Sequence, residues 1–341
     1  MSKKNNSNRV KLIVNPGAGN ASESSGNLKF VTNYLIKAGL KIDVALAKPK
    51  KEAIPIARRA VKEGYKTVLA MGGDGTIEAI VQGIVGSKTR LGVIPAGTEN
   101  NIAKSLGIPL ELTDACDFFL TNKAIKIDLG QVKTSKGKKF IFTEMATIGL
   151  SAAIYPDASK VQDGQITKIL SAARTLIQQT TTPVVYLTLD DESKIKVETM
   201  LVMVSNTPEF GKNFLVASNA SMRDGLLDIS VYPEFSKSEL MGYYTAVMDG
   251  GFSGDGKVQQ YQARKIKIKS DPKLAVMADG IELGSGSVTI KVLPGALRII
   301  APAKKETSKT PQNDNPQLKL PQPVELVEEG NHNNKHENSE K

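Results

Sequence analysis

Histidine and cysteine are nearly absent from this chain of 341 residues. It has one cysteine, Cys116, and two histidines, His332 and His336, both within the last ten residues. A single cysteine cannot form an intramolecular disulfide. Without a histidine in the body of the chain, a Ser-His-Asp triad, Cys-His catalysis and His-ligated zinc are excluded there. Proton transfer must therefore use a carboxylate, a lysine or a tyrosine.

Long apolar runs and tryptophan are also missing. No run approaches the roughly 18–20 apolar residues of a membrane span, and the polar start MSKKNNSNR lacks the apolar stretch of a signal peptide. We therefore expect a cytoplasmic protein. Aromatic residues make up only 5% of the chain, which disfavours a base-stacking platform, so no nucleic-acid partner is expected.

Positive charge is in excess. The formal charge is +10, and the segment from Ala301 onward holds 6 Lys and 7 Asp or Glu, so residues 1–300 carry about +11. A basic body suits a polyanionic ligand or an anionic membrane surface, but it also fits a well-solvated surface. Charge alone does not choose between them.

Strand and helix patterns alternate over the first 130 residues. Strands that are nearly all apolar and alternate with helices are typical of a parallel sheet covered on both faces. We therefore predict a doubly wound α/β domain over residues 9–130. The expected strands are 10–15, 41–47, 67–73 and 91–97, and the expected helices lie near 28–36, 52–64, 76–86 and 99–108.

Beyond residue 125 the pattern changes to many strands joined by short turns. Two helical patterns, near 165–179 and 237–249, interrupt them. This predicts a mainly antiparallel, β-rich sandwich or barrel over residues 131–303, whose last strand could return to the first domain. Residues 1–8 and 304–341 are polar and are expected to be disordered. The expected strands are 125–132, 139–150, 183–190, 193–206, 225–233, 263–270, 274–283, 287–293 and 296–302.

The stretch LAMGGDGTIEAI, residues 69–80, leads from an apolar strand into a helix through three glycines. Backbone N–H groups are free at a helix N-terminus, and glycine lets a phosphate approach them without meeting a Cβ atom. A carboxylate such as Asp74 is repelled by phosphates unless a divalent cation lies between them or it handles a proton. Taken alone, the turn fits either a phosphate site or a plain connection in which Asp74 is a helix cap.

Two more turns with glycine follow strands of the same predicted sheet. NPGAG (15–19) follows the first strand, and PAGTENN (95–101) follows the fourth. The carboxyl ends of strands form the binding crevice of a doubly wound sheet, so the three turns predict one large phosphate-bearing ligand. Neither the G-x-G-x-x-G nor the G-x-x-x-x-G-K-[ST] pattern is present.

These motifs, in this order, resemble the diacylglycerol kinase catalytic family, which includes bacterial lipid kinases and sphingosine kinases. They are N-P-x-x-G, G-G-D-G-T and P-x-G-T-x-N, with D-G-L-L-D and a late D-G, over roughly residues 9–303. The resemblance implies ATP between an α/β domain and a β-rich domain, Mg²⁺, and γ-phosphate transfer to the hydroxyl of a lipid such as diacylglycerol. GGDGT alone is also similar to NAD kinases, whereas PxGTxN and the long β-rich half differ from those.

The resemblance also implies roles for individual residues. Asp74 would be catalytic and work with Mg²⁺, and Asp128 in IDLG would be structural and electrostatic. Asp224 would bind a structural magnesium with main-chain oxygens of Ser221 and Leu226, although Asp-Gly is also a common turn. The expected ATP-binding residues are Asn15, Pro16, Gly17, Ala18, Gly19, Gly72, Gly73, Asp74, Gly75, Thr76, Ile77, Glu78, Gly97 and Thr98.

The chain departs from the family pattern in three places. Asn101 stands where the family often has Asp, and Lys104 stands where it usually has Arg. The late motif reads Asp-Gly-Ile-Glu instead of Asp-Gly-Glu, so the expected general base, Glu282, is displaced by one residue. One residue reverses the face of a strand, so Glu282 would need a bulge to reach the cleft. Otherwise Asp279 or Asp74 would have to act, or the protein is a weak kinase.

Other acceptors and partners stay open at this point. A sphingoid-base or NAD-type kinase, and a nucleotide- or lipid-binding protein that has lost turnover, are the alternatives. We expect a lipid substrate at an anionic membrane surface, with peripheral association, and a homodimer is possible. Lys265, Lys267 and Lys269 share one face of a predicted strand, where a solvated face is favoured over membrane contact.

Overall fold

The computed structural model describes residues 8–18, 24–48, 50–149, 182–210, 214–215, 217, 219–232 and 258–303. The two helices expected in the β-rich half, the first seven residues and the C-terminal tail lie outside these ranges. None of the described helices is long and apolar enough to cross a membrane.

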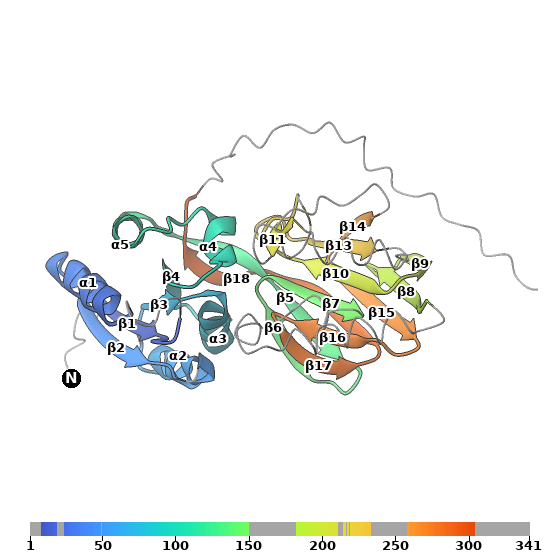
Figure 1. The fold of residues 1–341 in the computed structure, drawn as a ribbon, viewed down its shortest axis with the longest axis horizontal. Coiled ribbons are helices and arrows are strands. Elements are labelled where there is room, and N and C mark those ends of the chain that lie inside the picture. Colours follow the sequence, from blue (N-terminus) through green and yellow to red (C-terminus); the bar gives the residue numbers. More distant parts are fainter. Residues whose placement is uncertain are drawn as a thin grey trace, which may run out of the picture. The chain divides into compact units, whose positions relative to one another are not determined.

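The N-terminal half is an α/β domain with a parallel sheet, as the sequence predicts (Figure 1). Its four strands lie in the order β2-β1-β3-β4. Helices α2 and α3 pack on one face, α1 and α5 on the other, and every residue of β3 is buried. The elements are β1 (Arg9–Val14), α1 (Ser24–Lys37), β2 (Lys41–Leu46), a 3-10 helix (Lys50–Glu52), α2 (Ala53–Lys62), β3 (Thr67–Gly72), α3 (Asp74–Ile84), β4 (Arg90–Pro95), α4 (Asn101–Leu106) and α5 (Leu112–Thr121).

Two long strands continue this sheet into the β-rich half. They are β5 (Ala124–Thr134) and β18 (Val288–Ile300), which pair antiparallel along their length. Near its end β18 also pairs in parallel with β4, where Arg298 lies opposite Arg90. The last strand therefore returns to the first domain, and the predicted boundary at 130/131 falls inside β5. The two domains share a continuous sheet.

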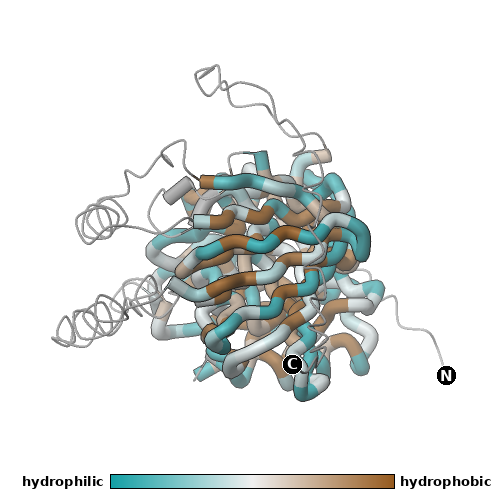
Figure 2. Tube along the Cα trace, turned by 90° about the vertical axis from the view of Figure 1, so that its right-hand side faces the viewer, coloured by the Kyte–Doolittle hydropathy of each residue, from teal (hydrophilic) through white to brown (hydrophobic). Residues whose placement is uncertain are grey.

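Two packed sheets form most of the β-rich half that the structure describes. One is the far part of the shared ten-stranded sheet, and the other is six-stranded in the order β14-β13-β10-β7-β16-β17. Apolar and polar residues alternate along the strands (Figure 2), and the apolar sets of both sheets meet in one core. The strands are β6 (Lys139–Phe142), β7 (Met145–Gly149), β8 (Val184–Leu189), β9 (Ser193–Glu198), β10 (Leu201–Ser205), β11 (Glu209–Phe210), β12 (Phe214–Leu215), β13 (Leu227–Tyr232), β14 (Gln259–Ala263), β15 (Lys265–Asp271), β16 (Ala275–Ala278) and β17 (Ile281–Ser285).

Three stretches predicted as single strands are each divided in two. The stretch 139–150 bends at Thr143 and Glu144 between β6 and β7, and 193–206 breaks between β9 and β10. The stretch 274–283 reverses direction at Asp279 and Gly280, which both have positive φ, at 42° and 70°. Asp-Gly in this conformation forms a two-residue hairpin, so β16 and β17 lie side by side.

Candidate active site

The NPGAG and GGDGT turns meet at the carboxyl ends of β1 and β3. The side-chain oxygen of Asn15 accepts a hydrogen bond from Gly17 N at 3.1 Å, and its amide donates to Thr76 Oγ at 3.4 Å. A small open hollow lies beside them, lined in part by Asn15, Ala18 and Met71. The sequence predicts phosphate binding at this edge, and the structure brings the two turns together there.

The GGDGT and PAGTEN turns touch through their glycines. A Cβ atom built on Gly97 would lie 2.3 Å from the Cα of Gly73, and one built on Gly73 would lie 3.0 Å from the Cα of Gly97. Asn100, in a left-handed conformation with φ 54°, donates to Gly97 O and accepts from Gly97 N. Gly97 is therefore required for the contact between two backbones, whatever ligand binds beside them.

We expect Gly97→Ala to separate these turns, because the new methyl group has no space beside the Gly73 backbone. Thermal unfolding should shift to lower temperature, and binding of Mg·ATP measured by calorimetry should weaken. Gly17→Ala is the matched control for stability alone, because its Cβ would meet only Asn15 Oδ1 at 3.6 Å, an ordinary contact. An unchanged melting temperature in Gly97→Ala would contradict this packing role, and weakened ATP binding in Gly17→Ala alone would indicate that a phosphate approaches Gly17.

Asp74 begins α3 but its carboxylate binds α4. Oδ2 accepts a hydrogen bond from Asn101 N and Oδ1 accepts one from Ile102 N, both at 3.0 Å. The carboxylate therefore satisfies two N–H groups at the start of another helix and does not cap its own. Burial raises the pKa of Asp74, and these backbone hydrogen bonds oppose that rise. Asp74 is thus held rigidly where the three turns converge.

The other predicted ATP-binding residues differ in what their side chains do. Thr76 is buried and Ile77 packs in the hydrophobic core, so Ile77 could contribute only its backbone to a ligand site. Thr98 is exposed on its turn, and Glu78 lies one helical turn after Asp74. Gly19 lies outside the described residues.

Glu144 is a buried carboxyl group that sequence reasoning misses. It lies in the bend after β6, is only 2% exposed, and its Oε2 is 3.5 Å from Nδ2 of Asn101. Burial raises the pKa of Glu144 well above its usual range, and the negative charges of Asp74, Glu78 and Asp279 raise it further. A glutamate within the apolar stretch 139–150 is itself a signal, because a fully buried carboxyl group is rare without a role. Asn101 and Glu144 connect the α/β domain to the β-rich domain at this site.

Asp279 holds the bend that contains Glu144. Its carboxylate accepts hydrogen bonds from the backbone N–H groups of Thr143, Glu144 and Met145, at 2.6 Å, 3.1 Å and 3.2 Å. Burial raises the pKa of Asp279 to about 6, although these three hydrogen bonds oppose the rise. Asp279 therefore positions the bend.

Glu282 is exposed, unlike the buried carboxyl groups of Glu144 and Asp279. Ala278 pairs with Ile281 and Met277 pairs with Glu282, so the side chains of Ile281 and Glu282 are on opposite faces of the hairpin. The strand does contain a bulge, but the extra residue is Leu283, which follows Glu282 and does not turn it relative to Ile281. Glu282 is exposed to solvent on β17. The structure thus groups Asp74 with Glu144 and Asp279, and it places Glu282 on the other face of β17 from Ile281.

Asp128 connects β5 to two other segments. Its carboxylate accepts hydrogen bonds from Gly225 N at 2.8 Å and Gly295 N at 2.7 Å, and its own N–H donates to Met222 O at 2.7 Å. Gly295 lies in the irregular part of β18, so Asp128 secures both that bulge and the loop before β13. Its position is structural, in agreement with one part of the role that the resemblance implies.

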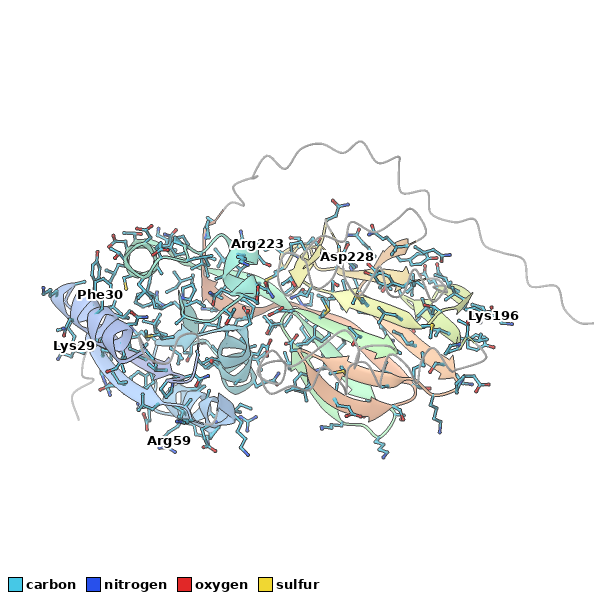
Figure 3. All side chains as sticks on the ribbon, viewed as in Figure 1. Lys29, Phe30, Arg59, Lys196, Arg223 and Asp228 are labelled. Carbon is cyan, nitrogen blue, oxygen red and sulfur yellow. The ribbon has the colours of Figure 1, made fainter. Side chains whose placement is uncertain are left out.

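The predicted magnesium ligands occupy that loop. Asp224 Oδ1 accepts a hydrogen bond from Leu226 N at 3.0 Å, and Ser221 Oγ accepts one from Arg223 N at 3.3 Å. Burial raises the pKa of Asp228 to about 6, and the negative charge of Asp224 contributes to this rise. Asp228 and Arg223 are labelled in Figure 3. A cation beside these two carboxylates would relieve their repulsion, and oxygen donors suit Mg²⁺. Among the described residues no three His, Cys, Asp or Glu side chains form a metal cluster, so such an ion would rely on main-chain oxygens.

The fold and the site define a two-domain kinase, in which an α/β domain with glycine turns adjoins a β-sandwich. The chain belongs to the diacylglycerol kinase catalytic family: residues 9–132 match the model of the diacylglycerol kinase catalytic domain, and residues 145–301 match the YegS C-terminal NAD kinase beta sandwich-like domain. The family and its kinase activity are therefore as the sequence predicts.

Individual relatives agree with the family. A diacylglycerol kinase of Mycobacterium tuberculosis is 27% identical over 246 residues, which is 71% of this chain and 79% of the relative. A probable lipid kinase YegS-like of Pseudomonas aeruginosa is 27% identical over 285 residues, 82% of this chain and 90% of the relative. A crystal structure from Bacillus anthracis matches with a TM-score of 0.69 at 24% identity, covering 87% of this chain and 96% of that one, which shows the fold.

Proposed function

We propose that this protein transfers the γ-phosphate of ATP to the hydroxyl group of a lipid, with diacylglycerol as the model acceptor. One observation carries the proposal. The Asp74 carboxylate is held by α4 where three glycine turns meet, and the buried carboxyl group of Glu144 from the other domain is nearby. An acidic pair beside a phosphate-binding edge suits phosphoryl transfer, which depends on positioning and on charge neutralisation.

On the donor side, the three turns would bind the triphosphate with backbone N–H groups. Mg²⁺, when bound between the phosphates and Asp74, would neutralise charge that develops on the transferred group. Asp74 fits this role because two backbone N–H groups of α4 hold its two carboxylate oxygens in a fixed orientation. The carboxylate therefore need not reorganise during the reaction. The structural loop of Asp224 would hold a second ion away from the reaction.

On the acceptor side, Glu144 would accept the proton of the lipid hydroxyl. The hydroxyl oxygen forms a bond to the γ-phosphorus, the bond from that phosphorus to the bridging oxygen breaks, and ADP leaves. A raised pKa suits a general base, because a carboxylate of ordinary pKa is a weak proton acceptor at neutral pH. Asn101 would orient Glu144 through the hydrogen bond of its side-chain amide.

This assignment replaces Glu282 as the preferred base. Glu144 is near the charges of Asp74 and Asp279, whereas Glu282 is exposed on β17. Ile281, which stands where the family's glutamate is expected, is 48% exposed and cannot accept a proton. The general base that the family has directly after its Asp-Gly pair would thus be replaced here by Glu144, in the bend next to that hairpin.

The relatives favour a lipid as the acceptor, since they are named as diacylglycerol kinase and lipid kinase. Their chemistry would bring this chain to membrane surfaces, where such acceptors reside, so we also propose peripheral membrane association. A soluble acceptor is the competing possibility, and the physical state of the acceptor distinguishes the two.

The direct test is incorporation of radiolabelled γ-phosphate into a panel of lipids presented in uncharged detergent micelles and in vesicles. We expect a labelled lipid monophosphate with a diacylglycerol or a related lipid alcohol, dependent on Mg²⁺. The panel includes a sphingoid base and NAD as competing acceptors. Labelling of NAD without any detergent or vesicle requirement would overturn the lipid assignment, and no labelling of any acceptor would overturn the kinase assignment.

A further inference from the structure

Lysines on neighbouring strands of the ten-stranded sheet face the same way. In β15, Ile266 and Ile268 point into the sandwich core, so the lysines that alternate with them point outward. The strand register continues this arrangement through β6, β5, β18, β15, β8 and β9. Directly paired residues in these six strands form the row Lys139, Lys133, Thr289, Lys267, Thr188 and Lys194. Five gaps of about 4.8 Å between strands give this row a length of about 24 Å.

Two flanking rows add further positive charge. Lys291 pairs with Lys265 on one side, and Lys269, Tyr186 and Lys196 pair on the other. We call this set the lysine face, and Figure 3 labels Lys196 on its edge strand. All of its lysines are exposed except Lys265, which is half-buried. The lysine face consists of Lys133, Lys139, Lys194, Lys196, Lys265, Lys267, Lys269 and Lys291.

Acidic side chains lie at the margins of the lysine face. Asp191, in the turn between β8 and β9, forms ion pairs with Lys265 at 2.6 Å and Lys267 at 2.7 Å. Asp271 and Glu198 both pair with Val184, in the row beyond Lys269, Tyr186 and Lys196. Within the described part of the chain, the other six lysines of the face form no ion pair, so the face as a whole keeps a net positive charge.

We propose that the lysine face docks the protein on an anionic lipid bilayer. All eight cations are lysines, which are hydrated point charges suited to the non-directional field of a charged bilayer, whereas planar recognition of single phosphates favours arginine. Single-stranded nucleic acids need several aromatic platforms, and one exposed aromatic residue, Tyr186, lies on these rows. Tyrosine is common at membrane interfaces, where its ring is apolar and its hydroxyl group reaches water.

The lysine face and the active site share a strand. Lys139 begins β6, and Glu144 follows the end of the same strand five residues later, about 17 Å along an extended chain. The main-chain oxygen of Ile141 in β6 also accepts a hydrogen bond from Gln82 on α3, the helix that begins with Asp74. Docking through the lysine face would therefore place the bilayer on the side of the molecule where β6 begins. From there β6 runs toward Glu144.

The choice of a bilayer as partner rests on the proposed lipid acceptor, but its test does not need catalysis. Cosedimentation of the full-length protein, without ATP, would be measured with vesicles of neutral phosphatidylcholine and with vesicles that contain 30% anionic phosphatidylserine. The variant replaces Lys133, Lys194, Lys196 and Lys269 by Gln. Each lysine near an anionic surface contributes about fivefold to binding, so we expect partitioning onto anionic vesicles to fall at least about a hundredfold.

The matched control replaces four exposed lysines of the α/β domain by Gln: Lys29, Lys37, Lys51 and Lys62. It removes the same charge and should lose much less affinity. Equal losses in both variants would mean that net charge alone drives binding, and no loss in the first would exclude the lysine face; either result overturns the proposal. So would loss of oligonucleotide binding in the first variant with vesicle binding unchanged.

Two further measurements keep the result interpretable. Thermal unfolding shows whether the quadruple variant is folded, and a Lys194→Gln, Lys196→Gln variant on the edge strand is the milder substitute, with an expected loss of at least about tenfold. Kinase activity in uncharged micelles should be unchanged in the variant and should fall on anionic vesicles. If no lipid is phosphorylated by the wild type, the proposed function fails, while the vesicle comparison still decides the docking surface.

Discussion

Asp74→Asn should reduce phosphate transfer by about a thousandfold or more, because the reaction then lacks the negative charge that would bind the metal beside the phosphates. The amide keeps the shape of the carboxylate but places an N–H₂ group against one of the two N–H donors of α4. Loss of a cap costs about 1 kcal/mol, so the protein should remain folded. Initial rates with radiolabelled ATP, calorimetry of Mg·ATP binding and thermal unfolding measure the three effects separately.

Asp114→Asn is the control for Asp74→Asn. Asp114 lies in the first turn of α5 and is exposed, so the same change at a helix start should leave the rate unaltered. If Asp74→Asn lowers the melting temperature but turns over like the wild type, Asp74 serves only as the cap of α4. The catalytic assignment would then be wrong, and the resemblance would apply to the fold alone.

Glu144→Gln should lower the rate of transfer and raise the stability of the protein. Loss of a general base typically costs about 10²–10⁴-fold in rate. The amide oxygen can still accept the hydrogen bond from Asn101, and a neutral group removes the repulsion with Asp74, Glu78 and Asp279. A residue with a purely structural role would not combine lower activity with a higher melting temperature, whereas functional sites often do.

The gain in stability should depend on pH. Folding raises the pKa of Glu144 above that of the unfolded chain, so the folded state favours the protonated carboxyl group. The stabilisation is present below the unfolded pKa of about 4.3 and is lost as pH rises through the folded pKa. Wild type and Glu144→Gln should thus melt alike near pH 4, and the variant should be increasingly more stable toward pH 8. One pKa unit corresponds to about 1.4 kcal/mol.

Glu282→Gln makes the same chemical change at an exposed carboxylate and is the control for Glu144→Gln. We expect it to alter neither the rate nor the melting profile. If Glu282→Gln loses two orders of magnitude in rate while Glu144→Gln is active, the base predicted from the motif is correct and the assignment to Glu144 is not. A difference in melting temperature that stays flat between pH 4 and pH 8 would show that folding does not raise the pKa of Glu144.

The sequence predicts the α/β domain well because each of its signals is local. The apolar strand β3, buried on both faces, and the glycine turn after it can be recognised within a dozen residues. The location of Asp74 in a phosphate-binding turn is likewise predictable. The hydrogen-bond partners of Asp74 are not predictable. Asn101 N and Ile102 N belong to the start of α4, which follows a different strand and meets Asp74 only in the folded domain.

The β-rich half shows where local patterns are insufficient. The stretch 139–150 reads as one strand, and only the carboxylate of Asp279, from a hairpin far along the chain, explains why it bends at Glu144. The burial of Glu144 depends on both domains, so its role cannot be seen in either pattern alone. The bulge expected near Glu282 exists, but its position at Leu283 is set by pairing with β16, which the sequence does not reveal.

The shared strand β18 affects how the chain can fold while it is being synthesised. Arg298 in β18 pairs with Arg90 in β4, and the same strand covers β5 along its length. At about 5–20 residues per second, the ribosome needs roughly 10–40 s to advance from β4 to β18. During that interval β4 and β5 have open edges, which are prone to pair with other chains. A nascent chain truncated before residue 288 would therefore be a preferred substrate for chaperones and proteases.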